Sequence, residues 1–306
     1  MSEEWLGRPE RGSLVLLRLL TWFSLRIGRP LSRLLLYPIC LYFVVFSRGT
    51  SLISRRYLER VLGRHVQWTD IFLHYHTFAS TIHDRVYLLS GQHRWFDVKT
   101  EGTEIVESLL DRKCGFILMG SHLGSFEVLR AKGLLERHLP IHVVMHEGAA
   151  SNLNSVLHGL CAGIRDRIIQ PGRPDTMLKV KECLDKGEVV GILADRVLSG
   201  EKTVNCSFLG ASTVFPEGPF LLAGMLQVPV VLFFGFYEGG RQYRIRFEPF
   251  AEAIHWDRAR RAEASVEWVR QYAKRLEYYC LRYPYNWFNF YELSDRTTDS
   301  DMPARP

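Results

Sequence analysis

The chain has 306 residues, of which 47% are hydrophobic and 24% charged, so it is long enough for one large domain and too apolar for general disorder. Its formal net charge is +6, but the charge is unevenly spread. Residues 1–60 hold ten arginines, no lysine and four acids, so residues 61–306 are neutral overall. A basic surplus confined to an apolar N-terminus is unlike the basic stripe of nucleic-acid-binding proteins, and we expect no nucleic acid as partner.

The cysteine and histidine spacing predicts neither a disulfide framework nor a metal site. The cysteines are scattered without a CxxC pair, which is typical of reduced thiols in a cytoplasmic compartment. The densest histidine group, LHYHTFASTIHD, places His76 and His83 two turns apart on a predicted helix, with His74 facing elsewhere. We therefore expect ordinary histidines on a helix surface and no bound metal. The six cysteines are Cys40, Cys114, Cys161, Cys183, Cys206 and Cys280.

The first fifty residues differ in composition from the rest. SLVLLRLLTWFSLRIGRP, residues 13–30, predicts an amphipathic helix with Leu, Trp, Phe and Ile on one side. Arg18 and Arg26 lie on the other side. This pattern is typical of a helix that lies in a membrane interface.

The apolar run that follows is short for a membrane span. It holds thirteen uncharged residues, Leu34 to Phe46, against the ~20 that cross a bilayer, and Pro38 is expected to interrupt it. It begins too late for a cleaved signal peptide, and no small-residue cleavage site follows. We expect residues 1–50 to be an anchor that is embedded in, or shallowly spans, a membrane with anionic lipids. The alternative is a pair of core helices in a soluble protein.

From residue 51 onward, predicted strands and helices alternate. Several strands are continuously apolar, as strands buried on both faces are. The alternation predicts an α/β fold with a largely parallel central sheet of about seven strands flanked by helices. We expect this domain to span residues 51–294, followed by a disordered tail over 295–306. Predicted strands cover 96–102, 114–121, 141–147, 166–171, 188–195, 228–238 and 241–250, and predicted helices cover 51–63, 68–91, 125–137, 151–165, 174–186, 216–226 and 258–283.

A polar turn follows one of these strands in FILMGSHLGSFEVLR, residues 116–130. On one continuous helix, His122 and Glu127 would point about 140° apart. They meet only if His122 precedes the helix and the chain bends at Gly124, so that Glu127 points back. A carboxylate on one imidazole nitrogen makes the other nitrogen a better base. The spacing therefore predicts a general base that acts on a hydroxyl of the substrate.

HLGSFE, residues 122–127, matches the H-x4-D/E box of the lysophospholipid acyltransferase superfamily. Its setting resembles the branch that contains the bacterial lipid A late acyltransferases. The resemblance covers about residues 10–292, and NWFNFYEL at 286–293 is similar to the acyltransferases of aryl polyene and related pigment lipids. The other segments that resemble the branch are KVKECLDKGEVVGILADR (179–196), NCSFLGASTVFPEGPFLLA (205–223), VPVVLFFGFYEGGRQYRIRFEPF (228–250) and YPYNWFNFYEL (283–293).

The resemblance implies transfer of a fatty acyl group from an acyl thioester to a hydroxyl of a membrane lipid or glycolipid. His122 is then the catalytic base and Glu127 its orienting partner. No cofactor is implied, because the acyl chain arrives on acyl carrier protein, the expected partner, or on coenzyme A. The implied location is the cytoplasmic face of a bacterial inner membrane, with an anionic membrane surface as a further partner.

Four further residues are expected to bind substrate. Asp195 ends a predicted strand and resembles an acid of the branch, and sites in parallel sheets gather at the carboxyl ends of strands. Arg196 and the backbone amide of Gly124 are candidate donors to the anion that forms at the thioester carbonyl. The alternative for Arg196 is an ion pair with Asp195 or a surface acid. Arg173 matches, within a residue, a basic residue of the branch.

Two other interpretations stay open. A serine lipid hydrolase would use Ser121 or Ser125, but neither lies in a G-x-S-x-G elbow. A lipid- or pigment-binding protein of the same fold would have no activity, and the presence of both His122 and Glu127 argues against it.

FPEG, residues 215–218, is similar to a box that helps hold the acceptor phosphate in glycerol-phosphate acyltransferases. Pro219 and Phe220 replace the small polar and basic residues of that box. We therefore expect Glu217 to be a variable loop position, and a direct role for it is the alternative.

Overall fold

The fold is described from a computed structural model, which covers residues 14–129, 141–145, 156–157, 159–160, 167–197, 200–256 and 261–291. The expected tail over 295–306 lies outside these residues. The helix expected over 125–137 is seen from 126 to 129, and most of the helix expected over 151–165 also lies outside.

A seven-stranded sheet forms the centre, in the order β1-β9-β8-β2-β5-β3-β4. Its neighbours pair in parallel except β8 and β9, which form an antiparallel hairpin. The expected sheet of about seven largely parallel strands is therefore confirmed. The strands are β1 (Asp97–Glu101), β2 (Phe116–Gly120), β3 (Ile141–Val144), β4 (Ile168–Ile169), β5 (Val189–Leu193), β8 (Val230–Gly239) and β9 (Gln242–Ala251).

The central strands are apolar throughout because both of their faces are covered. All five residues of β2 are buried, and they alternate between two cores. Ile117 and Met119 pack into a cluster that includes Leu276 of α12, whereas Leu118 packs into a cluster that includes Leu109 of α7. A strand with two buried faces cannot show the alternation of a half-exposed strand.

The described helices after residue 47 are α5 (Arg48–Leu62), α6 (Trp68–Leu89), η2 (His93–Trp95), α7 (Thr103–Asp111), α10 (Thr176–Asp185), α11 (Gly218–Leu226) and α12 (Arg261–Arg282).

A second, two-stranded sheet lies outside the predicted strands. It consists of β6 (Thr203–Phe208) and β7 (Ala211–Pro216), joined by a tight turn in which Leu209 and Gly210 both have positive φ. Two positive φ values suit the right-handed twist of a hairpin. Leucine is an unusual residue for the first of these positions, so the turn carries no recognisable sequence signal. Helix α7 was also missed.

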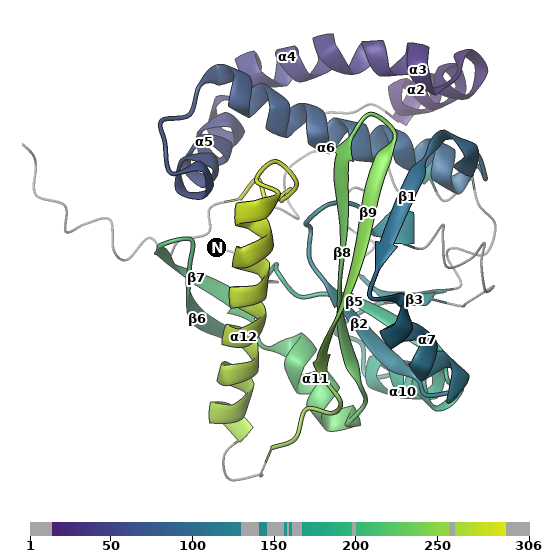
Figure 1. Cartoon of the computed structure of the whole chain (residues 1–306), viewed down its shortest axis with the longest axis vertical. Helices are drawn as coiled ribbons and strands as arrows, with labels where there is room; N and C mark the ends of the chain where they lie inside the picture. Colours follow the sequence, from purple (N-terminus) through teal and green to yellow (C-terminus); the bar gives the residue numbers. More distant parts are fainter. Residues whose placement is uncertain are drawn as a thin grey trace, which may run out of the picture.

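Four short helical segments form an N-terminal layer: α2 (Leu14–Ile27), α3 (Arg29–Ser32), η1 (Arg33–Leu35) and α4 (Leu36–Phe46). Figure 1 shows this layer along α6, on the side away from the sheet. Residues Arg29–Phe46 are long and apolar enough to cross a membrane by length and composition, and 22% of the stretch is buried inside the protein. Pro38 does not interrupt α4, because it lies in the first turn, where a helix tolerates proline.

Candidate active site

The site lies where two neighbouring parallel strands end. Strands β2 and β5 pair in register, with Gly120 opposite Leu193. His122 and Asp195 each follow two residues after these positions, so the two side chains leave the same edge of the sheet side by side. The pairing of two strands thus brings together residues that are 73 positions apart in the chain.

Asp195 is the centre of a hydrogen-bonded cluster. Its Oδ1 lies 2.8 Å from Nδ1 of His122, and its Oδ2 accepts the backbone N–H of the same histidine at 2.9 Å. Oδ2 also accepts the indole Nε1–H of Trp287 at 3.0 Å. The Asp195 side chain is fully buried, while that of His122 is 28% exposed. The imidazole is therefore fixed by Asp195 on its buried side, and the rest of the ring is partly accessible to a substrate.

The site's charges keep Asp195 ionised. Burial alone would raise the pKa of this carboxyl, but the charge and hydrogen bonds of His122, with the charge of Arg196, lower it to about 2. Enclosure lowers the pKa of His122 below its usual 6.5, and the Arg196 and Arg85 charges act in the same direction, against Asp195. A carboxylate only accepts hydrogen bonds, so Nδ1 of neutral His122 carries the proton and Nε2 presents its lone pair.

The turn after His122 has the geometry that the spacing predicted. Gly124 has a φ of +84°, and helical residues begin at 126. A Cβ on Gly124 would lie 2.0 Å from the carbonyl oxygen of Gly235 on β8, so only glycine fits. The Gly124 amide donates to the carbonyl oxygen of Asn286 at 2.8 Å. This amide is thus already used within the fold, and its role toward a substrate stays a prediction.

The position of Glu127 bears on the predicted pair. Its carboxylate lies 3.7 Å from the guanidinium of Arg85 on α6, and both side chains are largely buried. One imidazole nitrogen of His122 was expected to meet Glu127, and the structure shows Nδ1 in contact with Asp195. Whether Glu127 also orients the imidazole stays a prediction.

The C-terminal segment after α12 closes the site. Phe288 donates its backbone N–H to the carbonyl oxygen of His122 at 2.9 Å. The Asn286 side chain bonds both the N–H and the C=O of Tyr237 on β8. These residues fall in one segment that resembles the acyltransferase branch, but no role was predicted for Trp287 or Asn286. The indole of Trp287 is fully buried, and a polar contact of a buried tryptophan has no local sequence signal.

The two expected arginines occupy different settings. Arg196 donates from Nη2 to the carbonyl oxygen of Phe288 at 2.9 Å, and its guanidinium lies 5.2 Å from the Tyr291 ring. Its Nε is buried without a hydrogen-bond partner among the described residues. Arg173 is exposed in the turn between β4 and α10, and its backbone N–H donates to Thr176. No contact within the described residues joins Arg173 to His122.

The histidines of α6 are not ordinary surface residues. His74 is fully buried and bridges Ser54 on α5 at 2.8 Å and the carbonyl oxygen of Trp287 at 2.9 Å. His83 lies 2.8 Å from the hydroxyl of Ser32. The expectation of helix-surface histidines was wrong for His74, because α6 is covered on both sides.

Glu217 has a structural contact with helix α12. The Glu217 carboxylate accepts a hydrogen bond from Ser265 on α12.

A separate group of three side chains could hold a metal ion: His142, Cys183 and Glu188. Each offers one potential ligand atom, and these atoms lie within 4.8 Å of one another. The distance between His142 Nε2 and Glu188 Oε2 is 2.9 Å. These three residues lie at the amino ends of β3 and β5, the opposite end from His122.

A neutral histidine backed by a buried carboxylate at the carboxyl edge of a parallel sheet has the chemistry of a group that can accept a proton. A model of the family described as bacterial lipid A biosynthesis acyltransferase matches residues 13–291. The chain belongs to this family and is therefore an acyltransferase of lipid biosynthesis. No curated protein matches the chain.

Proposed function

We propose that the protein transfers a fatty acyl group from a thioester to a hydroxyl of a membrane lipid or glycolipid, an O-acyl transfer with His122 as general base. The observation that supports this chemistry is the 2.8 Å contact between Nδ1 of His122 and Asp195. This contact engages Nδ1 and leaves Nε2 of a side chain that is 28% exposed for a substrate hydroxyl.

The reaction then needs no nucleophile from the protein. Nε2 of His122 takes the proton of the lipid hydroxyl as its oxygen attacks the thioester carbonyl. The carbon–sulfur bond breaks as the tetrahedral intermediate collapses, and the imidazolium returns the proton to the departing thiolate. Asp195 stabilises the transient positive charge, and Trp287 holds Asp195 in place.

The carbonyl oxygen carries negative charge in the intermediate, and a donor aimed at such an oxygen contributes about 3–4 kcal/mol. We assign this role to Arg196, whose buried Nε has no hydrogen-bond partner among the described residues. Arg173, on the loop after β4, remains a candidate for contacts with a more distant part of the substrates.

The other partners follow from the family and the charge pattern. The family is typically membrane-associated, and we place this chain at the cytoplasmic face of a bacterial inner membrane. We propose acyl carrier protein as the donor's carrier, because an acidic carrier is attracted to the arginine-rich N-terminal surface. Assignment to the enzymes of aryl polyene lipids stays a prediction.

The proposal is tested with the purified full chain, acyl carrier protein or coenzyme A thioesters, and lipids extracted from cells that lack the gene. His122→Ala should reduce the rate of ester formation by about 10²–10⁴-fold while the circular dichroism spectrum stays unchanged. His142→Gln, at the other end of the sheet, is the matched control and should keep the wild-type rate. Undiminished transfer by the His122 variant would exclude this residue as the base.

The same assay separates the two rival functions. Release of free fatty acid without an acceptor would indicate a hydrolase. No transfer from either donor, with the lipid still bound, would indicate a binding protein. Mass spectrometry of lipids from cells with and without the gene identifies the acceptor and the acyl chain together.

A further inference from the structure

We infer that the N-terminal layer, α2 to α4, lies flat in the interface of an anionic bilayer and that no segment from α2 to α4 crosses it. The surface that enters the lipid, called the lipid face here, includes Leu19, Trp22, Leu34, Leu41, Val45 and Phe46. The inference rests on the fold and the surface of the protein, and it goes beyond the proposed chemistry.

Exposed apolar side chains gather on this layer and its neighbours. Of the nineteen large apolar side chains that are exposed among the described residues, fourteen lie between Val15 and Leu73. Trp22 is 58% exposed, Leu34 61% and Phe46 64%. A water-soluble surface rarely shows such a concentration, which marks an interaction site.

Helix α4 has one face for the protein and one for the lipid. Leu36 and Cys40 are buried toward α6, and Leu34, Leu41 and Val45 on the other side are exposed. The exposed positions recur at helical spacing, so they form a single stripe along the outer side. A helix that crosses a bilayer alone would need an apolar surface all round, whereas this helix already rests on the protein along its length.

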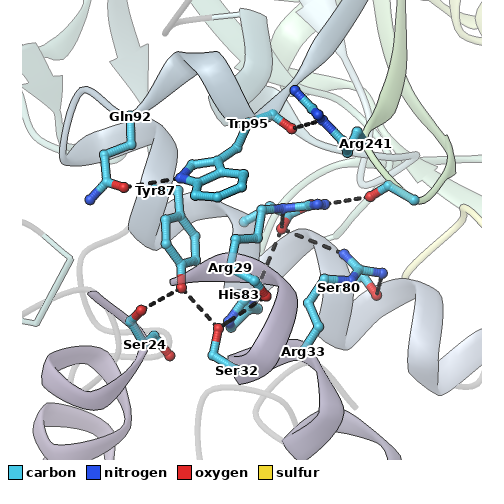
Figure 2. A network of polar contacts seen from close by, with 12 residues as sticks. Ser24, Arg29, Ser32, Arg33, Ser80, His83, Tyr87, Gln92, Trp95 and Arg241 are labelled. Carbon is cyan, nitrogen blue, oxygen red and sulfur yellow. Dashed lines mark hydrogen bonds and ion pairs between the residues drawn. The ribbon is translucent and has the colours of Figure 1, made fainter. Parts of the chain in front are cut away.

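Both ends of the candidate span contact the same helix. At the start, Arg29 forms a double hydrogen bond with Asp84 of α6, both at 2.8 Å, and Arg33 bonds Ser80 of α6 (Figure 2). Beyond its end, the hydroxyl of Ser51 lies 3.4 Å from that of Tyr75 of α6. The two ends of a membrane span lie on opposite sides of the bilayer. Here both are fixed to one helix of the globular domain, so they lie on one side.

Further contacts make the start of the candidate span part of the core. Arg29 is 3% exposed, and Tyr243 of β9 also donates to Asp84, at 2.8 Å. Ser32 contacts both His83 and Tyr87 (Figure 2). Pulling this turn into hydrocarbon would break a buried ion pair and leave Asp84 without its main partner. The eleven residues of α4 that remain reach only about 16 Å, against about 30 Å of hydrocarbon.

The charge around the lipid face fits an anionic membrane. Residues 14–69 contain nine arginines and a single acid, Glu59. Arg18, Arg26, Arg48 and Arg56 are exposed beside the apolar side chains. Basic side chains at the edge of an embedded helix are attracted to anionic headgroups.

This placement brings the lipid surface close to the site. Helix α6 lies between α4 and the sheet. Its residues Phe78 and Arg85 contact residues that surround His122. The rings of Phe78 and Phe288 are 5.2 Å apart, and Arg85 lies 3.7 Å from Glu127. In Figure 1 the tip of the β8–β9 hairpin ends beside α6, so the carboxyl edge of the sheet faces the N-terminal layer. An acceptor lipid therefore approaches His122 from the bilayer side of the molecule.

A protease assay separates a flat layer from a span. Full-length protein with an epitope tag before Met1 is added to sealed vesicles of phosphatidylcholine and phosphatidylglycerol. A flat layer leaves the tag outside, so protease added outside removes it without detergent. Protection of the tag until detergent is added would show that the chain crosses the bilayer and would overturn the inference.

Vesicle cosedimentation tests the lipid face itself. The triple variant Leu34→Glu/Leu41→Glu/Val45→Glu should lose at least about tenfold in vesicle binding, because three charges would enter the interface. Met177→Glu/Leu178→Glu/Leu281→Glu, on exposed apolar side chains elsewhere, is the matched control and should bind as wild type does. Vesicles without phosphatidylglycerol should bind more weakly. Unchanged binding of the triple variant, with its thermal unfolding also unchanged, would overturn the inference. His122→Ala should bind normally, so failure of the proposed chemistry would leave this test intact.

Discussion

Asp195 and Trp287 are joined by a 3.0 Å hydrogen bond from the indole Nε1 to a buried carboxylate oxygen. The bond links the loop after β5 to the segment after α12, and it leaves Oδ1 of Asp195 to hold Nδ1 of His122. The C-terminal segment therefore helps to fix the position of the His122 imidazole through Asp195.

Asp195→Asn should lower the rate of acyl transfer by about 10³–10⁴-fold, because an amide can donate to Nδ1 and leave the proton on Nε2. The wild-type rate should fall only below pH 6.5, since the pKa of His122 is lowered. The Asp195 charge opposes that lowering, so in the variant the acid limb should move to still lower pH. The measurement is kcat/KM across the acid range, and a limb that moves upward would contradict the assignment.

Glu127→Gln discriminates between the two carboxylates. If Asp195 alone orients the imidazole, this variant should retain the wild-type pH profile and lose less activity than Asp195→Asn. Glu127 would then act through Arg85, with which it forms an ion pair. A pH profile shifted as in the Asp195 variant would instead support the His122–Glu127 pair that the sequence spacing predicts.

Trp287→Phe tests the role of the indole N–H apart from its packing. The phenyl ring keeps most contacts with the Tyr57 and Phe208 rings, whose centroids lie 5.2 Å from that of Trp287. We expect kcat to fall about tenfold with little change in KM, and the free energy of unfolding to fall by about 1 kcal/mol. A purely structural role would be indicated by two results together. The losses in kcat/KM and in unfolding stability would be equal when both are expressed as free energies, and the substrate affinity would also change.

Stability should fall on the acid side because of His74. Burial lowers the pKa of this histidine to about 4, against the ordinary 6.5 that it regains on unfolding. Between these values the unfolded chain binds more protons, so the free energy of unfolding should decrease as the pH falls from 6.5 to 4, by up to about 3 kcal/mol. Urea unfolding at several pH values measures the slope. His74→Asn should flatten it, and replacement of the exposed His65 by Gln should not.

Metal removal should leave catalysis intact. The group of His142, Cys183 and Glu188 lies at the amino ends of the strands, and the site at their carboxyl ends needs only the chain's own side chains in the proposed reaction. Dialysis against a chelator should therefore leave the rate of acyl transfer unchanged. A loss that added zinc restores, but that is absent in Cys183→Ser, would show that this group binds a metal that activity needs.

The sheet was predictable because its signal is local. The central strands β2, β5 and β8 are apolar runs bounded by turn residues, and the order of strands and helices indicated the α/β class. The β6–β7 hairpin escaped because its tight turn uses Leu209. The position of His122 was also predictable, since the glycines around it mark a turn at the end of a strand; its role as base stays a prediction.

The hydrogen-bond partner of His122 was harder to predict. Sequence spacing pointed to Glu127, five residues away, whereas the structure places Asp195 on Nδ1 through the pairing of β2 with β5. A contact between neighbouring strands depends on strand order, and no local pattern encodes strand order. The same holds for Trp287, which reaches Asp195 from a segment 92 residues away.

The contacts of Arg29 also set an order of events during synthesis. Its partner Asp84 is 55 residues further along the chain, and Gly240, whose carbonyl it also bonds, is 211 residues further. At roughly 5–20 residues per second, Gly240 leaves the ribosome about 10–40 s after Arg29. The apolar N-terminal helices are thus complete well before the sheet that holds them. If the N-terminal layer binds a bilayer as proposed, it would be able to do so during this interval, before the catalytic domain is assembled.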